Sequence, residues 1–331
     1  MEQFIQGASM PLVVLLLIVG FVFLIKGADF FVEGSSSIAK RLQVPSIIIG
    51  LTIVAMGTSL PETAVSVTAS MVNNNALAVS NVIGSNIFNL MFVIGVCSIL
   101  TPIAVQRDTI VRDIPLSVIC ALLLAGLGIL GVGDKESYIL GHLDGVIFLV
   151  LFAGYIILMI RSALKARAEG KEVAIEGEED LKVLSYPKSI LCIVGGAIAI
   201  AIGGDLTVDT ASRIAVELGM SQTLVGLTIV SIGTSLPELV TSIVAARKNE
   251  VDMAVGNAVG SNIFNILMVL GIASAINPIG LLTENLIDIM ILVGFSLLVW
   301  AFAATKRKIT RKEGMAMVAL YLVYAIYIIL R

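Results

Sequence analysis

The chain has 331 residues, of which 58% are hydrophobic and only 14% are charged, with a formal net charge of −3 and a mean hydropathy of +1.03. A soluble protein of this length carries about a quarter charged residues, so the composition excludes an ordinary soluble domain. It predicts an all-α polytopic membrane protein embedded in the lipid bilayer. No basic tract suggests a nucleic-acid partner, and none is expected.

Apolar periodicity and its interruptions predict ten transmembrane helices. In chain order they are expected at residues 11–33, 45–72, 76–100, 114–133, 139–161, 188–212, 222–246, 252–276, 285–305 and 314–330. The N-terminal sequence lacks a positive leading region, so the first helix is interpreted as a retained anchor. The only markedly hydrophilic stretch, residues 162–187, is expected to be a cytoplasmic linker between two five-helix domains, residues 1–161 and 188–331.

The two halves are related by a shift of 176 residues. The hexapeptide GTSLPE occurs at residues 57–62 and again at 233–238, and GSNIFN occurs at 84–89 and 260–265. Between Gly27 and Asn89 the shift gives 30 identities in 63 positions without a gap. Shared apolar composition does not produce polar motifs in register, so the chain contains an internal repeat.

Basic residues indicate how the chain crosses the membrane, because Lys and Arg concentrate in cytoplasmic loops. The loops after the first, third, fifth, seventh and ninth expected helices, counted with Arg161 and Lys188 at the ends of the central linker, hold 17 of the 21 basic residues. Both termini are therefore expected outside the cytoplasm. Since each half has an odd number of helices, the second half is expected to be inverted, which is the plan of many secondary transporters.

The motif GTSLPE places a proline and a glutamate inside an apolar span, where both are costly. Pro61 cannot donate to the carbonyl of Gly57, so the helix is expected to break and to leave the carbonyls of Gly57 and Thr58 without regular partners. An unpaired charge on Glu62 at mid-span would cost on the order of 3 kcal/mol or more. Helical spacing gives one polar stripe of Ala55, Ser59, Glu62 and Ser66, and the second copy repeats Gly233, Thr234, Ser235, Pro237, Glu238 and Ser242.

The following helix of each half supplies a second polar stripe, formed by Asn81, Ser85 and Asn89 and copied by Asn257, Ser261 and Asn265. Two carboxylates, two freed threonine carbonyls and the neighbouring Ser and Asn oxygens suit a hard cation such as Ca²⁺, and neutral oxygens also serve Na⁺. Mg²⁺ fits less well because it gives up its waters reluctantly. The motifs contain no His or Cys, which argues against zinc, copper or iron.

Simpler interpretations of the same residues stay open. Ser and Asn in membrane helices often serve only to pack helices together, and each of these residues could do so. The two glutamates could be neutral and hydrogen-bonded.

The two copies of GTSLPE and GSNIFN, in opposite orientation, resemble the cation/Ca²⁺ exchanger superfamily, and specifically the prokaryotic Na⁺/Ca²⁺ exchangers with two α-repeats. The resemblance covers nearly the whole chain, with the α-repeat motifs at residues 52–89 and 228–265. It implies a ten-helix antiporter of the prokaryotic cell (inner) membrane that extrudes Ca²⁺ against inward Na⁺ by alternating access. Ca²⁺ and Na⁺ would be its substrates; no cofactor and no protein partner are expected, and a monomer would be complete.

The resemblance also implies a ligand set. Matched to motif positions, the Ca²⁺ ligands would be Glu62, Glu238 and the carbonyls of Thr58 and Thr234. The Na⁺ ligands would be Ser59, Ser235, Ser85, Ser261 and the carbonyls of Ala55 and Ser231. Asn89 matches a central asparagine of the family, whereas Asn265 stands where several members, including K⁺-dependent ones, have aspartate, which weakens the case for K⁺ dependence.

Three rival functions follow from the same residues. A Ca²⁺/H⁺ antiporter on the same fold would use the glutamates as proton carriers, but a proton does not need the many hydroxyl and amide oxygens. A channel would need no counter-ion. An intramembrane hydrolase would need a base near its serine, and the repeats contain no histidine.

Overall fold

The computed structural model describes residues 2–71, 75–130, 138–168, 183–220, 229 and 231–330. In the first half the elements are α1 (Glu2–Gly7), α2 (Met10–Leu42), α3 (Ser46–Ile49), the π-helical turn η1 (Gly50–Val54), α4 (Ala55–Thr58), α5 (Leu60–Met71), α6 (Asn75–Ile87), η2 (Phe88–Val93), α7 (Ile94–Leu100), β1 (Ile103–Ala104), η3 (Thr109–Asp113), α8 (Ile114–Leu130), β2 (Ile139–Leu140) and α9 (His142–Ala168). The second half contains α10 (Tyr186–Glu217), α12 (Ser231–Gly233), α13 (Leu236–Arg247), α14 (Val251–Phe264), η5 (Asn265–Leu270), α15 (Gly271–Ile276), β3 (Ile279–Gly280), α16 (Thr283–Ala304), β4 (Lys308–Ile309) and α17 (Arg311–Leu330).

The chain is a helical membrane protein, as the composition predicts. Within the described ranges, eight helices are long and apolar enough to cross a membrane, and a bent pair, Ser46–Thr58 with Leu60–Met71, makes a ninth span. The span expected at 222–246 lies partly outside the described residues, and α12 and α13 cover its second part.

Several helices extend beyond their expected ends, and two do so by more than one and a half turns. The first span continues nine residues past 33, to Leu42, because the polar residues Ser35, Ser36 and Ser37 are buried inside the protein instead of facing water. The fifth span continues past 161 to Ala168, so the expected linker 162–187 begins with helix. In both places, polar composition suggested a membrane boundary although the helix continues beyond it.

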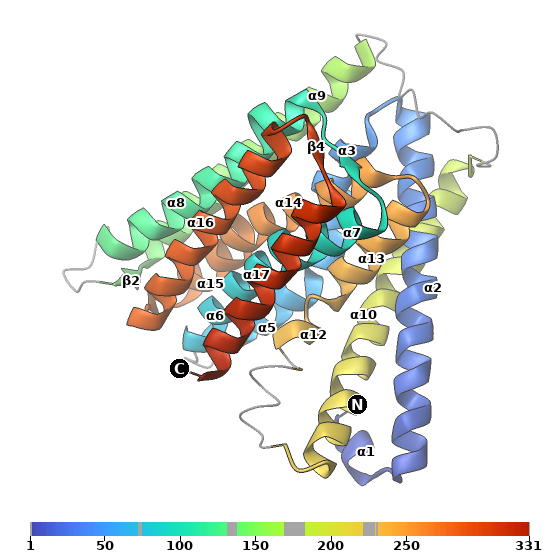
Figure 1. The fold of residues 1–331 in the computed structure, drawn as a ribbon, viewed down its shortest axis with the longest axis vertical. Helices are drawn as coiled ribbons and strands as arrows, with labels where there is room; N and C mark the ends of the chain where they lie inside the picture. Colours follow the sequence, from blue (N-terminus) through green and yellow to red (C-terminus); the bar gives the residue numbers. More distant parts are fainter. Residues whose placement is uncertain are drawn as a thin grey trace.

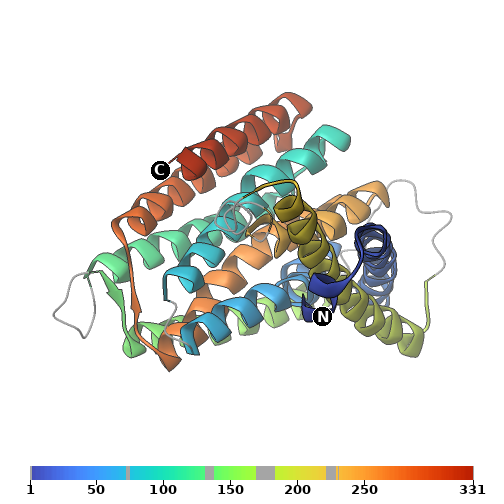
Figure 2. The same ribbon diagram turned by 90° about the horizontal axis from the view of Figure 1, so that it is seen from below.

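The long helices α2 and α10 lie side by side along one edge of the molecule and run in opposite directions (Figures 1 and 2). Glycines allow their backbones to approach closely. A Cβ added at Gly196 would lie 2.7 Å from the carbonyl oxygen of Gly27, and one added at Gly203 would lie 2.7 Å from the amide nitrogen of Leu24. In lipid the hydrophobic effect does not drive helices together, so close packing between small residues supplies the attraction.

The two spans that carry GSNIFN form the centre of the protein. The share of buried residues is 78% for both Leu77–Leu100 and Val251–Ile276, against 50% or less for the other long apolar helices among the described residues. Peripheral helices such as α9 and α17 instead expose Leu, Ile and Val side chains, as lipid-facing helices do. The repeated polar motifs are therefore held where lipid does not reach.

Two short antiparallel ribbons tie loops together at opposite ends of α16: β1 pairs with β4, and β2 pairs with β3. The segments β1 and β3 are equivalent under the 176-residue shift, yet they belong to different ribbons. The ribbon of β1 contains β4, which follows α16, whereas β3 itself precedes α16. α1 and the C-terminal end of α17 lie toward the same end of the bundle, away from β4 (Figure 1). The two equivalent segments β1 and β3 therefore lie at opposite ends of α16.

Candidate functional site

Each GTSLPE motif interrupts its helix. The chain bends by 49° between α4 and α5, and Ser59 at the break has φ −85° and ψ 10°, outside the regular helical range. In the second copy Ser235, with φ −94° and ψ 5°, occupies the same position before α13. In both copies the proline is in the first turn of the new helix, where its missing N–H costs nothing. The glutamate one residue later lies in the first turn of each new helix and is fully buried.

The two glutamates are held by serines from both halves. Ser59 Oγ donates to Glu238 Oε1 at 3.0 Å, and Ser261 Oγ lies 3.4 Å from the same oxygen. On the other side, Glu62 Oε1 lies 3.3 Å from Ser235 Oγ and 3.4 Å from Ser85 Oγ, and these two hydroxyls are 2.9 Å apart. Each carboxylate therefore receives one serine of its own half and one of the opposite half.

A reciprocal pair of amides joins the two GSNIFN motifs. Asn86 Nδ2 donates to the carbonyl oxygen of Asn262 at 3.2 Å, and Asn262 Nδ2 donates to the carbonyl oxygen of Asn86 at 3.0 Å. Asn89 Nδ2 donates to Asn262 Oδ1 at 3.3 Å, and Asn265 Nδ2 donates to Asn86 Oδ1 at 3.1 Å. Because their acceptors are oxygens, this network fixes which end of the Asn89 and Asn265 amides carries the nitrogen.

Four oxygens of this cluster have no hydrogen-bond partner among the described residues: Glu62 Oε2, Glu238 Oε2, Asn89 Oδ1 and Asn265 Oδ1. All four side chains are fully buried. Buried polar atoms in native proteins are nearly always paired, so an unpaired set needs an explanation. The four atoms form two pairs related by the 176-residue shift. They are acceptors, which a cation can satisfy.

The motif threonines attach the broken helices to the central spans. Thr58 Oγ1 lies 3.0 Å from Asn257 Oδ1, and Thr234 Oγ1 lies 3.2 Å from Asn81 Oδ1. Asn257 Nδ2 in turn donates to Ser242 Oγ at 2.9 Å. The threonine side chains therefore fix the broken helices to the central spans.

Most of the sequence-predicted site residues lie in two buried, hydrogen-bonded groups. One group holds Glu238, Ser59 and Ser261, with Thr58 attached through Asn257. The other holds Glu62, Ser235, Ser85, Asn265 and Asn89, and Thr234 separately contacts Asn81. The carbonyl of Ala55 accepts from the amide of Ser59 at 3.0 Å, as in a regular helix. Ser231 begins α12, and its side chain lies outside the described residues.

Sequence reasoning missed three residues near these two groups. Asn86 and Asn262 form the amide pair, and their signal was available, because both belong to the repeated GSNIFN. Tyr155 of α9 donates its hydroxyl to the carbonyl oxygen of Leu51 at 2.8 Å, inside the π-helical turn η1. It lies outside the repeated motifs, so no pattern pointed to it. Turns of this kind are frequent at functional sites, and η2 and η5 contain Asn89 and Asn265.

The donor atoms of the central cluster are oxygens. In the part of the chain that the structure describes, no group of three or more His, Cys, Asp or Glu side chains could hold a metal ion. The central cluster offers two carboxylates and several neutral oxygens. Such a set suits hard cations of low charge density and not the softer transition metals.

Comparisons with known proteins identify the family. A family model described as "Sodium/calcium exchanger protein" matches residues 12–161 and 188–330. CaxA of Alkalimonas amylolytica is 39% identical over 313 residues, covering 93% of this chain and 95% of that protein. The sodium/calcium exchanger MaX1 of Methanosarcina acetivorans is 31% identical over 342 residues, covering 94% and 97%.

A solved structure agrees with these sequence matches. The sodium-calcium exchanger NCX_Mj, in crystals soaked with 10 mM Na⁺ and no Ca²⁺, superposes with a TM-score of 0.80 at 33% sequence identity. The superposition covers 95% of this chain and 98% of that one. The chain therefore belongs to the sodium/calcium exchanger family, a family of membrane antiporters.

Proposed function

We propose that this protein exchanges Na⁺ for Ca²⁺ across the cell membrane by alternating access. One observation carries the proposal: the centre of the protein holds two buried glutamates and two buried asparagines, each with one oxygen that has no described donor. Family membership and the names of MaX1 and NCX_Mj support Na⁺ and Ca²⁺ as the ions. The protein would act as a transporter and not as an enzyme.

Glu62 and Glu238, with the carbonyls of Thr58 and Thr234, are the proposed Ca²⁺ ligands. Two carboxylates balance the charge of one Ca²⁺, and neutral oxygens complete a coordination number of about six to eight. For Na⁺ the proposed ligands are the serine hydroxyls at 59, 85, 235 and 261 and the carbonyls of residues 55 and 231. In this proposal Asn89 and Asn265 contribute their unpaired Oδ1 atoms.

Shared ligands would couple the two ions. Because Na⁺ and Ca²⁺ would both need the glutamates, the carrier holds one ion species or the other. An empty carrier would keep two desolvated carboxylates close together, which repel each other. The empty form is therefore reluctant to change sides, and this favours exchange over leak.

Alternating access would use the repeat architecture. We propose ten spans in two inverted five-helix repeats, with both termini outside the cytoplasm and the basic loops inside. The antiparallel pair α2 and α10, packed through glycines along one edge, is the candidate moving unit (Figure 1). Cross-linking this pair to α13 should block transport and spare Ca²⁺ binding, and unaffected transport would count against the movement.

A vesicle experiment tests the proposal. Purified protein is reconstituted, the vesicles are loaded with Na⁺ and diluted into Na⁺-free medium containing radioactive Ca²⁺, and uptake is followed with and without a proton ionophore. Uptake that needs the outward Na⁺ gradient and survives the ionophore is the expected result. Uptake driven by a pH gradient and indifferent to Na⁺ would instead establish Ca²⁺/H⁺ antiport on the same fold and remove the Na⁺ role of the serines.

A further inference from the structure

Two cavities of different size each border one residue pair that is equivalent in the two halves. The smaller, about 220 Å³, is lined by Val32 and Glu33 of α2. The larger, about 760 Å³, is lined by Val208 and Asp209 of α10, the residues 176 positions later. The larger cavity also reaches Thr234, the residue before the serine that bonds Glu62. The cavity beside the second motif is therefore wide, while the cavity at Glu33 and Glu250 is narrow.

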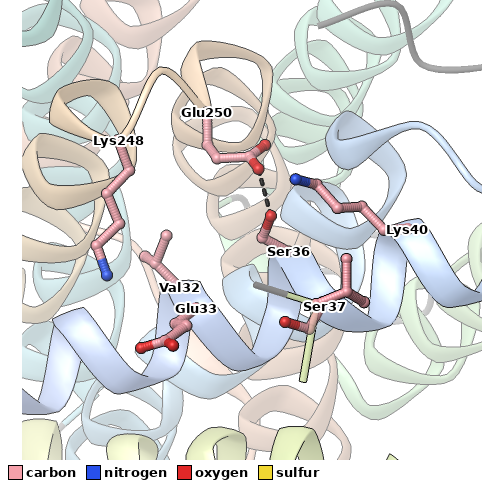
Figure 3. Close-up of a pocket in the computed structure, with 8 residues that line it drawn as sticks. Val32, Glu33, Ser36, Ser37, Lys40, Lys248 and Glu250 are labelled. Atoms are coloured by element: carbon pink, nitrogen blue, oxygen red, sulfur yellow. Dashed lines mark hydrogen bonds between the residues drawn. The ribbon is translucent and has the colours of Figure 1, made fainter. Parts of the chain in front are cut away.

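The narrow cavity is crossed by polar contacts between α2 and the turn that joins α13 to α14. Ser36 Oγ donates to Glu250 Oε1, and Glu250 is only 3% exposed (Figure 3). Lys248 Nζ donates to the carbonyl oxygen of Asp29 at 2.8 Å and lies 3.3 Å from Asp29 Oδ1. Figure 3 also shows Lys40 pointing toward Glu250. We call Asp29, Ser36, Lys248 and Glu250 the clamp.

The clamp joins the candidate moving helix to the site. The turn that holds Lys248 and Glu250 directly follows α13, the half-helix that begins beside Glu238. It is a tight turn, with Asn249 at φ 61°, so both clamp residues are fixed relative to α13. Asp29 and Ser36 are almost two helical turns apart on α2, so the two contacts hold α2 at two points.

The sequence allows the charged contacts of this clamp at one end of the molecule only. The turn in the second repeat reads RKNEV at residues 247–251, whereas the equivalent segment of the first repeat reads MVNNN at 71–75. Val72 and Asn74 stand where the second repeat has Lys248 and Glu250, and neither can form an ion pair. The end of the molecule that has the charged turn is also the end that has the smaller cavity.

We infer that the clamp is a conformational latch: it closes the end of the transport path that carries Lys40 and Lys248 and favours the state in which the larger cavity is open. This inference rests on the proposed alternating access. Opening the closed end requires α2 to leave the α13–α14 turn, so both contacts must break in every cycle. The sequence of the first repeat has no lysine or glutamate at the equivalent turn to form an opposing ion pair, and this biases the resting protein toward one state.

Cysteine labelling tests the latch without measuring ion flux. Val32→Cys reports on the narrow cavity and Val208→Cys on the wide one, each in a background without Cys97, Cys120 and Cys192. Labelling by a soluble maleimide is measured on purified protein in detergent. Lys248→Gln, Glu250→Gln and Ser36→Ala remove one contact each. Arg247→Gln is the matched control, because Arg247 is an exposed cation in the same turn and outside the clamp.

Each clamp variant should speed labelling at position 32 by about fivefold or more and slow it at position 208, since a coupling of modest size shifts a two-state equilibrium by that factor. The double variant Asp29→Lys/Lys248→Asp, which swaps the two charges, should restore the wild-type labelling rates at both positions. Unchanged labelling in all three variants, or an equal effect of Arg247→Gln, would overturn the latch. Absent ion exchange in the wild-type protein would overturn the proposed function, while labelling would still decide whether the latch exists.

Discussion

The hydroxyl of Ser59 lies 3.0 Å from Oε1 of Glu238, a residue 179 positions further along the chain. The equivalent contact joins Ser235 to Glu62 at 3.3 Å. Each GTSLPE motif therefore supplies the glutamate of its own half and a hydroxyl to the glutamate of the other half. These crossed contacts make one site from the two repeats, because neither motif alone surrounds its carboxylate.

Replacing either motif glutamate should abolish exchange. Glu62→Gln and Glu238→Gln each remove a unit of negative charge from a fully buried site at nearly constant volume. Two unit charges about 4 Å apart interact by about 4 kcal/mol at an effective dielectric of 20, and Ca²⁺ carries two charges, so Ca²⁺ affinity should fall by at least about 10³-fold. Calorimetry with Ca²⁺ on detergent-purified protein measures this.

The matched control for the glutamates is Glu284→Gln, which changes an exposed carboxylate in the first turn of α16. It should leave Ca²⁺ affinity and exchange unchanged. Wild-type affinity in either Glu62→Gln or Glu238→Gln would mean that this carboxylate is a structural group and not a ligand.

The crossed serines should affect affinity less than the glutamates and should act through them. Ser59→Ala removes the 3.0 Å hydrogen bond to Glu238, and a lost partner of a metal ligand typically costs about 10–100-fold in affinity. In a Glu238→Gln background the same change should cost much less, because its charged partner is gone. Ser296→Ala is the control, since Ser296 is buried but bonds only within α16, to Leu292. Equal, additive losses in both backgrounds would refute the coupling.

The position of the site was predictable because glutamate and proline cost free energy in an ordinary apolar span. Glu62 and Glu238 interrupt apolar spans, and the prolines one residue earlier predicted the break that the structure places at Ser59 and Ser235. Helical spacing also predicted which serines and asparagines share a face. These features are local, so one sequence is enough to find them.

Contacts between segments far apart in sequence were not predictable. Spacing placed Ser59 on the same stripe as Glu62, but the break at Ser59 turns its hydroxyl to Glu238. The length of α2 was also missed, because Ser35, Ser36 and Ser37 read as a membrane boundary until their burial is known. Tyr155 stands outside every repeated motif, so only its contact with Leu51 reveals a supporting role.

Removing the hydroxyl of Tyr155 should destabilise the first motif helix. Tyr155→Phe leaves the carbonyl oxygen of Leu51 buried without its 2.8 Å donor in the π-helical turn η1. A buried acceptor that loses its partner costs about 1–3 kcal/mol, and thermal unfolding in detergent should show the loss. Tyr321→Phe is the matched control, because the Tyr321 ring packs on Phe88 and Phe92 and keeps those contacts. Equal unfolding temperatures for the two variants would argue against the Tyr155 contact.

Adjacent glycines on α10 allow a sharp test of the α2–α10 contact. A Cβ at Gly196 would lie 2.7 Å from both the carbonyl oxygen of Gly27 and the amide nitrogen of Phe31, and backbone atoms cannot yield as side chains can. Gly196→Ala should therefore separate the two helices at a cost of about 1–3 kcal/mol and slow exchange, measured as Na⁺-driven Ca²⁺ uptake. Gly195→Ala, one residue away, meets no atom within 4 Å and should preserve both stability and uptake. If both variants transport at the wild-type rate, close backbone contact between α2 and α10 is not needed for the movement, and the two helices need not act as one unit.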